Sequence, residues 1–225
     1  MVSGGSSGIG WAIASYLGDA GVTVMVADVR PLPEAQANIH YQKTDLTKAA
    51  DVEKLFGATI ETIGEPDLVV VSAGRGVTER LDEGDPANWE QVLALNVMGA
   101  LRVVRAFVPA MVTAGRGDVV VISSVSAGKP HAWGGVYGAS KTALSHLAET
   151  LRLEVQPAVR VLTVAPGVVD TPFFERRIGG GDRPEDLGWG ALEPSDVAEV
   201  VVFALTRRAE VAINEIVIRP APQSF

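Results

Sequence analysis

The sequence contains no cysteine and few histidines, and it has no excess of positive charge. Each of these lacks excludes a class of function. Its 225 residues include no Cys and three His, at positions 40, 131 and 146. Disulfide bonds, thiolate nucleophiles and thiolate metal sites are therefore excluded, and scattered histidines do not indicate a metal centre. Lys and Arg total 19 against 27 Asp and Glu. The resulting net charge of −8 argues against nucleic acid or an anionic membrane as the main partner.

Long apolar runs are also lacking. Residues 200–205 form one of the longest, far below the roughly 20 apolar residues of a membrane-spanning helix. The first residues do not resemble a secretory signal, which begins with a basic segment and continues with an apolar one. Apolar residues nevertheless make up 47% of the chain, enough for a large core. We therefore expect a cytoplasmic protein with one domain over residues 1–225 and no membrane partner.

Two kinds of segment alternate along the chain. Short runs of Val, Ile and Leu predict buried strands at 22–27, 68–71, 119–122, 159–164 and 216–218. Helical spacing of apolar residues predicts helices at 9–20, 49–63, 89–114, 137–155 and 195–206. This alternation predicts an α/β fold with a doubly wound, mostly parallel sheet.

A polar, glycine-rich segment interrupts this alternation at 170–193. It contains three consecutive glycines at 179–181 and follows the strand predicted at 159–164. Open α/β sheets bind their ligands beyond the carboxyl ends of their strands. We therefore expect a substrate lid at 170–193, with an ordinary surface loop as the alternative.

Glycines are concentrated at the start of the chain, where residues 3–10 read Ser-Gly-Gly-Ser-Ser-Gly-Ile-Gly and lead into the first helix. Such a loop lets the backbone approach a pyrophosphate, and the helix N-terminus offers N–H donors and a partial positive charge. A glycine pattern alone is weak evidence, because a plain turn before a helix looks the same.

Asp28 strengthens this interpretation, since it follows Gly10 by 18 residues at the end of the second predicted strand. A carboxylate there can accept hydrogen bonds from ribose hydroxyls. It would also repel a 2′-phosphate by roughly 4 kcal/mol at a separation of about 4 Å. The sequence therefore predicts NAD as the cofactor rather than NADP, although Arg30 leaves NADP open because it can pair with a phosphate.

The strongest chemical signal is Tyr137 followed four residues later by Lys141. Positions i and i+4 share one face of a helix, so the phenol and the ammonium can serve one site. An ammonium and a positively charged nicotinamide ring both favour the phenolate, and tyrosine can then act as a general acid or base. Ser124, 13 residues upstream at a strand end, can donate a hydrogen bond to a substrate oxygen.

These motifs together resemble the short-chain dehydrogenase/reductase family over nearly the whole chain. The matches fall in the family's order, and they are Gly4…Gly8-Ile9-Gly10, Asp45-Leu46, Ser72-Ala73-Gly74, Asn96, Ser124, Tyr137…Lys141 and Pro166-Gly167…Thr171. The resemblance implies a seven-stranded Rossmann-type sheet and NAD(P)-dependent interconversion of an alcohol and a ketone.

The resemblance also implies roles for individual residues. Ser124 would polarise the carbonyl, Tyr137 would transfer the proton, Lys141 would hold the nicotinamide ribose, and Asn96 would hold a water. The implied cofactor-binding residues are Gly4, Ser6, Ser7, Gly8, Ile9, Gly10, Asp28, Asp45, Leu46, Ala73, Gly74, Tyr137, Lys141, Pro166, Gly167, Val169 and Thr171.

The sequence departs from the family pattern at three places. Ser3 replaces the usual threonine but keeps its hydroxyl, and Val71-Ser72 replace two asparagines. The first strand, which is central in the family's sheet, is shortened, because only two residues precede Ser3. This shortening favours a rival interpretation, a catalytically silent relative that binds a dinucleotide, whereas the intact Ser124–Tyr137–Lys141 set favours an enzyme.

The substrate remains open. Residues expected near it are His131, Trp133, Phe173, Phe174, Arg176, Arg177 and Trp189. The aromatic residues fit an apolar ligand surface or simple packing, and the arginines fit a carboxylate or a solvated loop. The chain's ending resembles the family branch that acts on serine and 3-hydroxy acids. In the family, helices corresponding to 89–114 and 137–155 form subunit interfaces, so we expect a homotetramer or homodimer.

Overall fold

A seven-stranded parallel sheet forms the centre of the molecule. The computed structural model describes residues 1–181 and 183–224. The strands run in the order β3-β2-β1-β4-β5-β6-β7, and every neighbouring pair is parallel. Their bounds are β1 Val2–Ser3, β2 Val24–Asp28, β3 Ile39–Lys43, β4 Leu68–Val71, β5 Asp118–Ile122, β6 Arg160–Pro166 and β7 Glu215–Ile218. The predicted doubly wound α/β fold of Rossmann type is confirmed.

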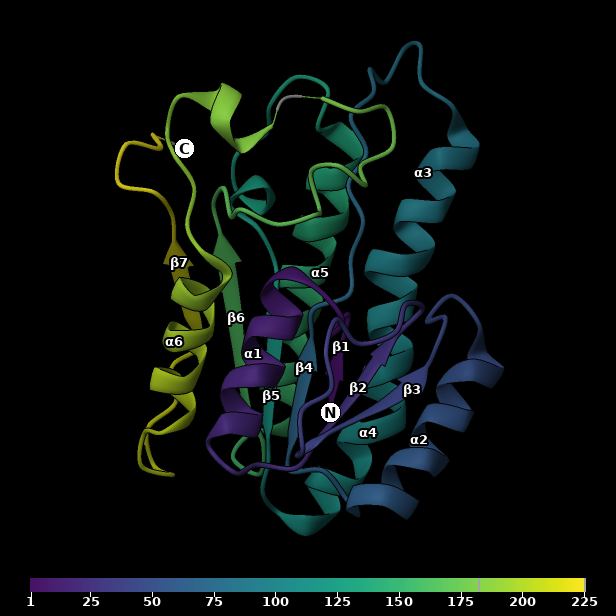
Figure 1. Ribbon diagram of the computed structural model, residues 1–225, viewed down its shortest axis with the longest axis vertical. Helices are drawn as coiled ribbons and strands as arrows, with labels where there is room; N and C mark the ends of the chain where they lie inside the picture. The colour runs from purple at the N-terminus through teal and green to yellow at the C-terminus, as the bar shows by residue number, and fades with distance from the viewer. Residues whose placement is uncertain (182, 225) are drawn as a thin grey trace.

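Helices cover both faces of this sheet. In Figure 1, α1 and α6 lie on the near face, while α2, α4 and α5 lie behind it. The bounds are α1 Gly8–Asp19, α2 Ala49–Ile63, α3 Pro86–Leu93, η1 Ala94–Gly99, α4 Ala100–Ala114, η2 Val125–Ala127, α5 Gly135–Val155, η3 Pro184–Leu187 and α6 Pro194–Leu205. Residues 170–181 and 183–193 pass over the carboxyl ends of the strands at the top of the view.

Alternating strand residues divide the core into two layers. Val69 and Val71 face the layer that contains α2, α4 and α5, whereas Val70 faces the layer with α1 and α6. Because successive strand side chains point to opposite faces, a strand covered on both sides must be apolar at every position. This is why the central strands β4 and β5 consist almost entirely of Val, Leu and Ile.

The first strand is short, as the sequence predicted. Val2 and Ser3 pair with β2 on one side and β4 on the other. Backbone hydrogen bonds continue the ladder past both ends, from the Val70 N–H to the Met1 carbonyl at 2.9 Å and from the Gly4 N–H to the Ala27 carbonyl at 2.8 Å. The Ser3 hydroxyl also donates to the Val70 carbonyl and accepts from the Ser72 N–H, both at 3.2 Å. These bonds tie the short strand to its neighbours.

The apolar pattern misses β3. This edge strand reads Ile-His-Tyr-Gln-Lys, and of these residues only Ile39 is buried. It pairs on one side with β2, so most of its side chains stay near solvent and carry no apolar run. Edge strands of this kind are hard to recognise from hydrophobicity.

The helix predicted at 89–114 begins earlier and contains a π-helical turn. Asp85 caps it by accepting from the Ala87 N–H, and Pro86 occupies its first turn, where a missing N–H costs nothing. By length and composition, Pro86–Ala114 is apolar enough to cross a membrane. However, core helices also pass that test, and Val103 and Phe107 of this helix pack in the core beside α2 and β4.

Candidate active site

A cleft of about 960 Å³ opens at the carboxyl ends of the strands. Parallel α/β sheets place ligands there because the strand ends and the following loops form a crevice. The cleft is lined by every candidate site residue except Ser6 and Asn96, which are buried behind it. The expected substrate-side residues, from His131 to Trp189, line it as well.

At two positions of the glycine loop, Gly4 and Gly8, the surrounding packing and the backbone conformation exclude a side chain. Gly4 has φ +67°, and a Cβ there would lie 2.6 Å from the Cα of Ala73. Gly8 has φ +53° and faces the Thr171 side chain. The loop leads into α1 with Ser7 as its N-cap, whose side chain makes no cap hydrogen bond. The first N–H groups of α1 therefore remain available to a phosphate, and the loop fits a dinucleotide.

Asp28 links the loop to the end of β2. Its buried carboxylate accepts from the backbone N–H of Ser6 at 3.2 Å and from that of Arg30 at 3.0 Å. The Arg30 guanidinium lies 3.4 Å from the same carboxylate and donates to the Ser7 hydroxyl at 2.9 Å. Asp28 thus lines the cleft, where a ribose hydroxyl could reach it, and its carboxylate already forms an ion pair with Arg30.

Asp45, Leu46, Ala73 and Gly74, which the resemblance assigns to the adenosine part of the cofactor, all line the cleft. Hydrogen bonds from Thr47 hold the pKa of the Asp45 carboxyl below its usual value, helped by the nearby Lys48 ammonium. This carboxylate therefore stays charged and accepts hydrogen bonds.

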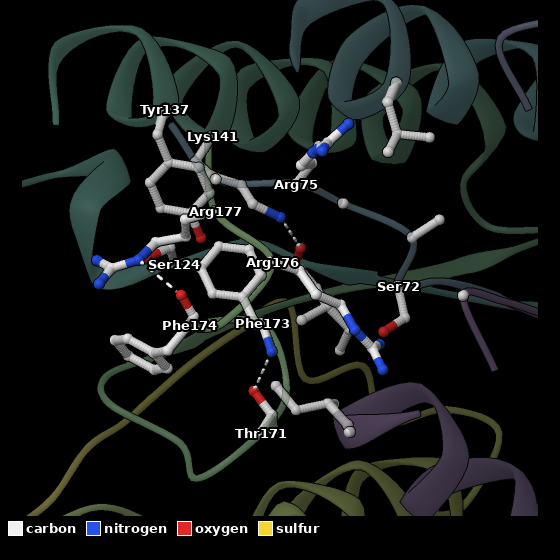
Figure 2. Close-up of a pocket in the computed structure, with 18 of the residues that line it drawn as sticks. Ser72, Arg75, Ser124, Tyr137, Lys141, Thr171, Phe173, Phe174, Arg176 and Arg177 are labelled. Carbon is white, nitrogen blue, oxygen red and sulfur yellow. Dashed lines mark hydrogen bonds between the residues drawn. The ribbon is translucent and has the colours of Figure 1, made fainter. Parts of the chain in front are cut away.

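Ser124, Tyr137 and Lys141 meet on one wall of the cleft, as Figure 2 shows. Ser124 follows β5 by two residues and caps η2. It hydrogen-bonds the Tyr137 side chain, and its hydroxyl also accepts from the Ser126 N–H at 3.1 Å. One turn along α5, the Lys141 ammonium donates to the Ile122 carbonyl at 2.8 Å and lies 5.9 Å from the Tyr137 ring centre. The i, i+4 spacing thus brings these side chains together as predicted.

Burial dominates the protonation of this group. It raises the pKa of Tyr137 to about 12, although the Ser124 hydrogen bond and the Arg177 charge both act to lower it. Burial also lowers the pKa of Lys141 to about 8. At neutral pH and without cofactor, Tyr137 is therefore a protonated acid beside a mostly protonated lysine.

Asn96 lies in the π-helical turn η1, fully buried. Its side-chain oxygen accepts from the Arg75 N–H at 2.8 Å, and its amide donates to the Arg75 carbonyl and the Ser140 hydroxyl, both at 2.9 Å. The amide thus fastens α5 to the loop after β4. That Asn96 holds a water stays a prediction.

A family model described as short chain dehydrogenase matches residues 1–178 of this chain. The chain belongs to the short-chain dehydrogenase family.

Relatives and solved structures agree with this assignment. The chain is 33% identical to an uncharacterised oxidoreductase of Staphylococcus saprophyticus, covering 98% of this chain and 96% of that protein. A serine dehydrogenase complexed with NADP⁺ is 28% identical with a TM-score of 0.93, over 100% of this chain and 95% of the other. An alcohol dehydrogenase from Thermococcus sibiricus, complexed with 5-hydroxy-NADP, is 28% identical with a TM-score of 0.86, over 99% and 96%. The short-chain dehydrogenase described here is therefore an oxidoreductase.

In this short-chain dehydrogenase, the end of β6 forms the floor of the cleft. Pro166, Gly167, Val169 and Thr171 line it, and Thr171 packs against Gly8 of the glycine loop. No sequence pattern marks Gln223, which is buried and whose side-chain oxygen accepts from the Val168 N–H at 3.0 Å. Gln223 approaches from 55 positions away in sequence, so only the fold reveals it.

Described residues of the segment 170–193, among them Phe173, Phe174 and Trp189, line the cleft of this short-chain dehydrogenase. Ile178 bridges Val77, with the Thr78 N–H donating to the Ile178 carbonyl at 2.9 Å and the Ile178 N–H donating to the Gly76 carbonyl at 3.1 Å. Phe173 places its ring 5.5 Å from the ring of Tyr137. The segment therefore contacts both the loop after β4 and the wall of the cleft that carries Tyr137.

Proposed function

We propose that this short-chain dehydrogenase interconverts a secondary alcohol and a ketone, with NAD as the preferred cofactor. The observation that carries the proposal is the Ser124–Tyr137 hydrogen bond above the buried Lys141, in the same cleft as a glycine loop that fits a dinucleotide. The bound nicotinamide would supply or accept the hydride.

The residues of the chain would orient the substrate and move its proton. Ser124 donates a hydrogen bond to the substrate oxygen, which stabilises negative charge developing there. In the reductive direction Tyr137, protonated because its pKa is about 12, donates its proton to that oxygen. In the oxidative direction it accepts the proton. Lys141 holds its ammonium on the Ile122 carbonyl beside Gly74, where it can meet a ribose hydroxyl.

The NAD preference rests on Asp28. Its carboxylate lies at the end of β2, where a ribose hydroxyl would be accepted and a 2′-phosphate repelled. Arg30 acts in the opposite direction, since its guanidinium is close enough to both Asp28 and Ser7 to receive a phosphate. Two solved neighbours are complexed with NADP⁺ and 5-hydroxy-NADP, so the relative affinities of this chain for NADH and NADPH test the role of Asp28.

The segment 170–193 is proposed as a substrate lid. Its backbone bonds to residues 76–78 attach it to the loop after β4, and Phe173 closes over Tyr137. Such closure excludes water from the proton-transfer site.

The first experiment is a fluorescence titration of the purified protein with NADH and, separately, with NADPH. We expect NADH to bind and NADPH to bind much more weakly. A screen of alcohols and ketones with the bound cofactor would follow. If the protein binds cofactor but turns over no alcohol or ketone, the result supports the alternative, a catalytically silent relative that binds a dinucleotide.

Tyr137→Phe tests the chemistry directly. The ring and its contact with Phe173 would remain, but no hydroxyl would transfer the proton. We expect turnover to fall by a factor on the order of 10²–10⁴ or more, with the dissociation constant for NADH within about twofold of wild type. Turnover near the wild-type rate in this variant would contradict the assigned role.

A further inference from the structure

Trp133 has an unusual backbone conformation in the loop before α5. Its φ is +67°, and among the residues that the structure describes every other positive φ belongs to a glycine. A bulky L-residue in this conformation is an outlier, because its Cβ crowds the following carbonyl oxygen. The next two residues, Gly134 and Gly135, would adopt it without strain. The chain therefore keeps a tryptophan at a position that favours glycine.

Packing within the protein leaves about half of this tryptophan open. Trp133 is 52% exposed, yet it lines the cleft. Its backbone is held in place, since its carbonyl accepts from the Glu79 N–H at 2.9 Å. The Arg80 Cζ lies 5.8 Å from the ring centre, near the outer limit of a cation–π interaction. The loop thus presents a large aromatic side chain at the edge of the cleft instead of burying it.

Trp133 lies directly before the helical turn that carries Tyr137. Gly134 is the N-cap of α5, and the Gly138 N–H donates to the Gly134 carbonyl at 2.8 Å, so the loop is joined to the first turn of the helix. Tyr137 belongs to this turn and lines the same cleft as Trp133. The two residues are four positions apart, which corresponds to about 5 Å along a helix. A substrate whose oxygen meets Tyr137 can therefore reach the indole with a substituent a few bonds away.

Two phenylalanines of the cleft differ from Trp133, because they pack against other rings. Figure 2 shows Phe173 and Phe174 beside Tyr137. The Phe173 ring centre lies 5.5 Å from that of Tyr137 and 5.9 Å from that of Phe174. Trp133 instead combines an exposed ring with a strained backbone, and such strain is concentrated at sites that bind or react. A ligand therefore explains the indole better than the stability of the fold does.

We propose that Trp133 stacks on a planar aromatic substituent of the substrate, so that the enzyme selects aryl-substituted ketones and alcohols over saturated ones. Aromatic rings in offset-stacked or edge-to-face contact gain free energy beyond that of their buried area. This inference rests on the proposed function. In the reductive direction the carbonyl carbon would gain the hydride of the reduced nicotinamide, its oxygen would gain the Tyr137 proton, and the aryl group would remain unchanged.

The test compares 4-phenyl-2-butanone with 4-cyclohexyl-2-butanone, which share the ketone and the carbon chain but differ in the planarity of the ring. We expect wild type to have a kcat/KM for the phenyl compound on the order of 3- to 10-fold above that for the cyclohexyl compound. In Trp133→Leu, which keeps an apolar side chain, this ratio should fall to about one, whereas Trp133→Phe should keep part of it. Equal values in wild type, or an unchanged ratio in Trp133→Leu, would overturn the proposal.

Leu81→Ala is the matched control, because Leu81 is an exposed apolar residue on the neighbouring loop. It is 66% exposed and lies against Gly135, but it does not line the cleft. This variant should keep the wild-type ratio. Light scattering of Trp133→Leu checks whether the indole instead contacts another copy of the chain. A lower mass than that of wild type, with an unchanged ratio, would overturn the proposal.

Thermal unfolding tests the strain separately from activity. Trp133→Gly and Trp133→Ala both remove the indole, so both should lose the aryl preference, but only alanine would retain the strain of a positive φ. We expect the glycine variant to unfold about 2–4 °C above the alanine variant. At an unstrained position the order is reversed, because glycine gives the unfolded chain more conformational freedom. That reversed order would overturn the proposal, since the tryptophan would then occupy its position without strain.

The outcome stays distinct from that of the proposed function. If wild type reduces neither ketone, titration calorimetry with 4-phenyl-2-butanone in the presence of NADH replaces the kinetic comparison. A dissociation constant that rises at least about threefold in Trp133→Leu supports the stacking site. Equal constants in the two proteins, or no binding by wild type, overturn it. A protein that binds the ketone through Trp133 but turns over no alcohol or ketone would refute the proposed function alone.

Discussion

The Asp28 carboxylate interacts with several groups of the protein, and these interactions would influence the choice between NADH and NADPH. Asp28 accepts two backbone N–H groups and pairs with Arg30. We expect Asp28→Asn, which keeps an acceptor for Ser6, to raise NADPH affinity by roughly 10-fold, because it removes repulsion of a 2′-phosphate. Arg30→Gln should lower NADPH affinity and leave NADH affinity nearly unchanged.

Dissociation constants from fluorescence titrations of each variant check this prediction. Glu34→Gln is the matched control, since it removes an exposed carboxylate from the loop that follows β2. Tighter NADPH binding in the control as well would show that net charge, rather than position 28, is responsible.

Lys141 should give the stability of the protein a distinct pH dependence. Burial lowers its pKa from 10.5 to about 8, so between these values the unfolded chain binds more protons than the folded one. Stability therefore rises with pH in this window. Relative to Lys141→Met, the free energy of unfolding of wild type should increase by about 2 kcal/mol between pH 7 and 9.5.

Urea unfolding at several pH values measures this difference, and Lys129→Met at an exposed lysine is the control. Tyr137 acts in the opposite direction, because its raised pKa lowers stability only above its ordinary value of 10. Below pH 10 the change in the free energy of unfolding therefore reports Lys141 without a contribution from Tyr137. If the free energies of unfolding of wild type and Lys141→Met changed in parallel with pH, this would contradict a lowered pKa of the buried Lys141 ammonium.

Some residues of the candidate site are placed by local sequence spacing, whereas others reach the site only through the fold. Tyr137 and Lys141 are one helical turn apart, so their spacing alone predicts that they share a face. Gln223 and Arg75 contact the site through the fold, from distant or irregular segments, and no local pattern marks them. Asn96 was named from the family resemblance, but its role as a fastener between α5 and the loop after β4 required the structure.

At the scale of elements, the apolar pattern located the strands that carry runs of Val, Ile or Leu. The strand expected at 216–218 is present as β7, but the prediction that it is buried was wrong, because β7 is an edge strand with no buried residue. The strands β2, β4, β5 and β6 are almost entirely buried, and each was found within a few residues. The edge strand β3 has one buried residue and left no signal. The π-helical turn inside the helix 86–114 also left none, because a one-residue bulge hardly changes the helical spacing of apolar residues.

A short backbone bridge attaches the proposed lid to the loop after β4. Thr78→Pro removes the N–H that donates to the Ile178 carbonyl, without changing the lid sequence. Losing one such bond costs about 1 kcal/mol, which corresponds to a roughly fivefold larger open population. We expect trypsin to cleave after Arg176 and Arg177 about fivefold faster in this variant.

Thr78→Val keeps the N–H and should be cleaved at the wild-type rate. Mass spectrometry of the first fragments locates the cuts, and added NADH should slow them in both proteins. An unchanged rate in Thr78→Pro would show that the bridge does not hold the lid closed.

At the scale of the whole molecule, large apolar side chains are exposed at several places, and two of these surfaces could serve as subunit interfaces. One follows the helix 86–114 and α5, where Met98 is 47% and Leu153 56% exposed. The other lies on α6 and β7, at one edge of the sheet in Figure 1, where Phe203 is 53% and Val217 55% exposed. Neither surface takes part in the cleft, so each is available for contact with another copy of the chain.

If each surface pairs with the same surface of another copy, the two interfaces generate a tetramer with two kinds of two-fold axis. We therefore expect light scattering at micromolar concentration to give about four times the chain mass of 23.6 kDa. Phe203→Glu should halve this mass, because a charge on α6 disrupts one interface and leaves the other. Tyr16→Glu, at a comparably exposed position on α1, should leave it unchanged. A wild-type protein that elutes as a single chain would show that the exposed apolar residues serve another purpose.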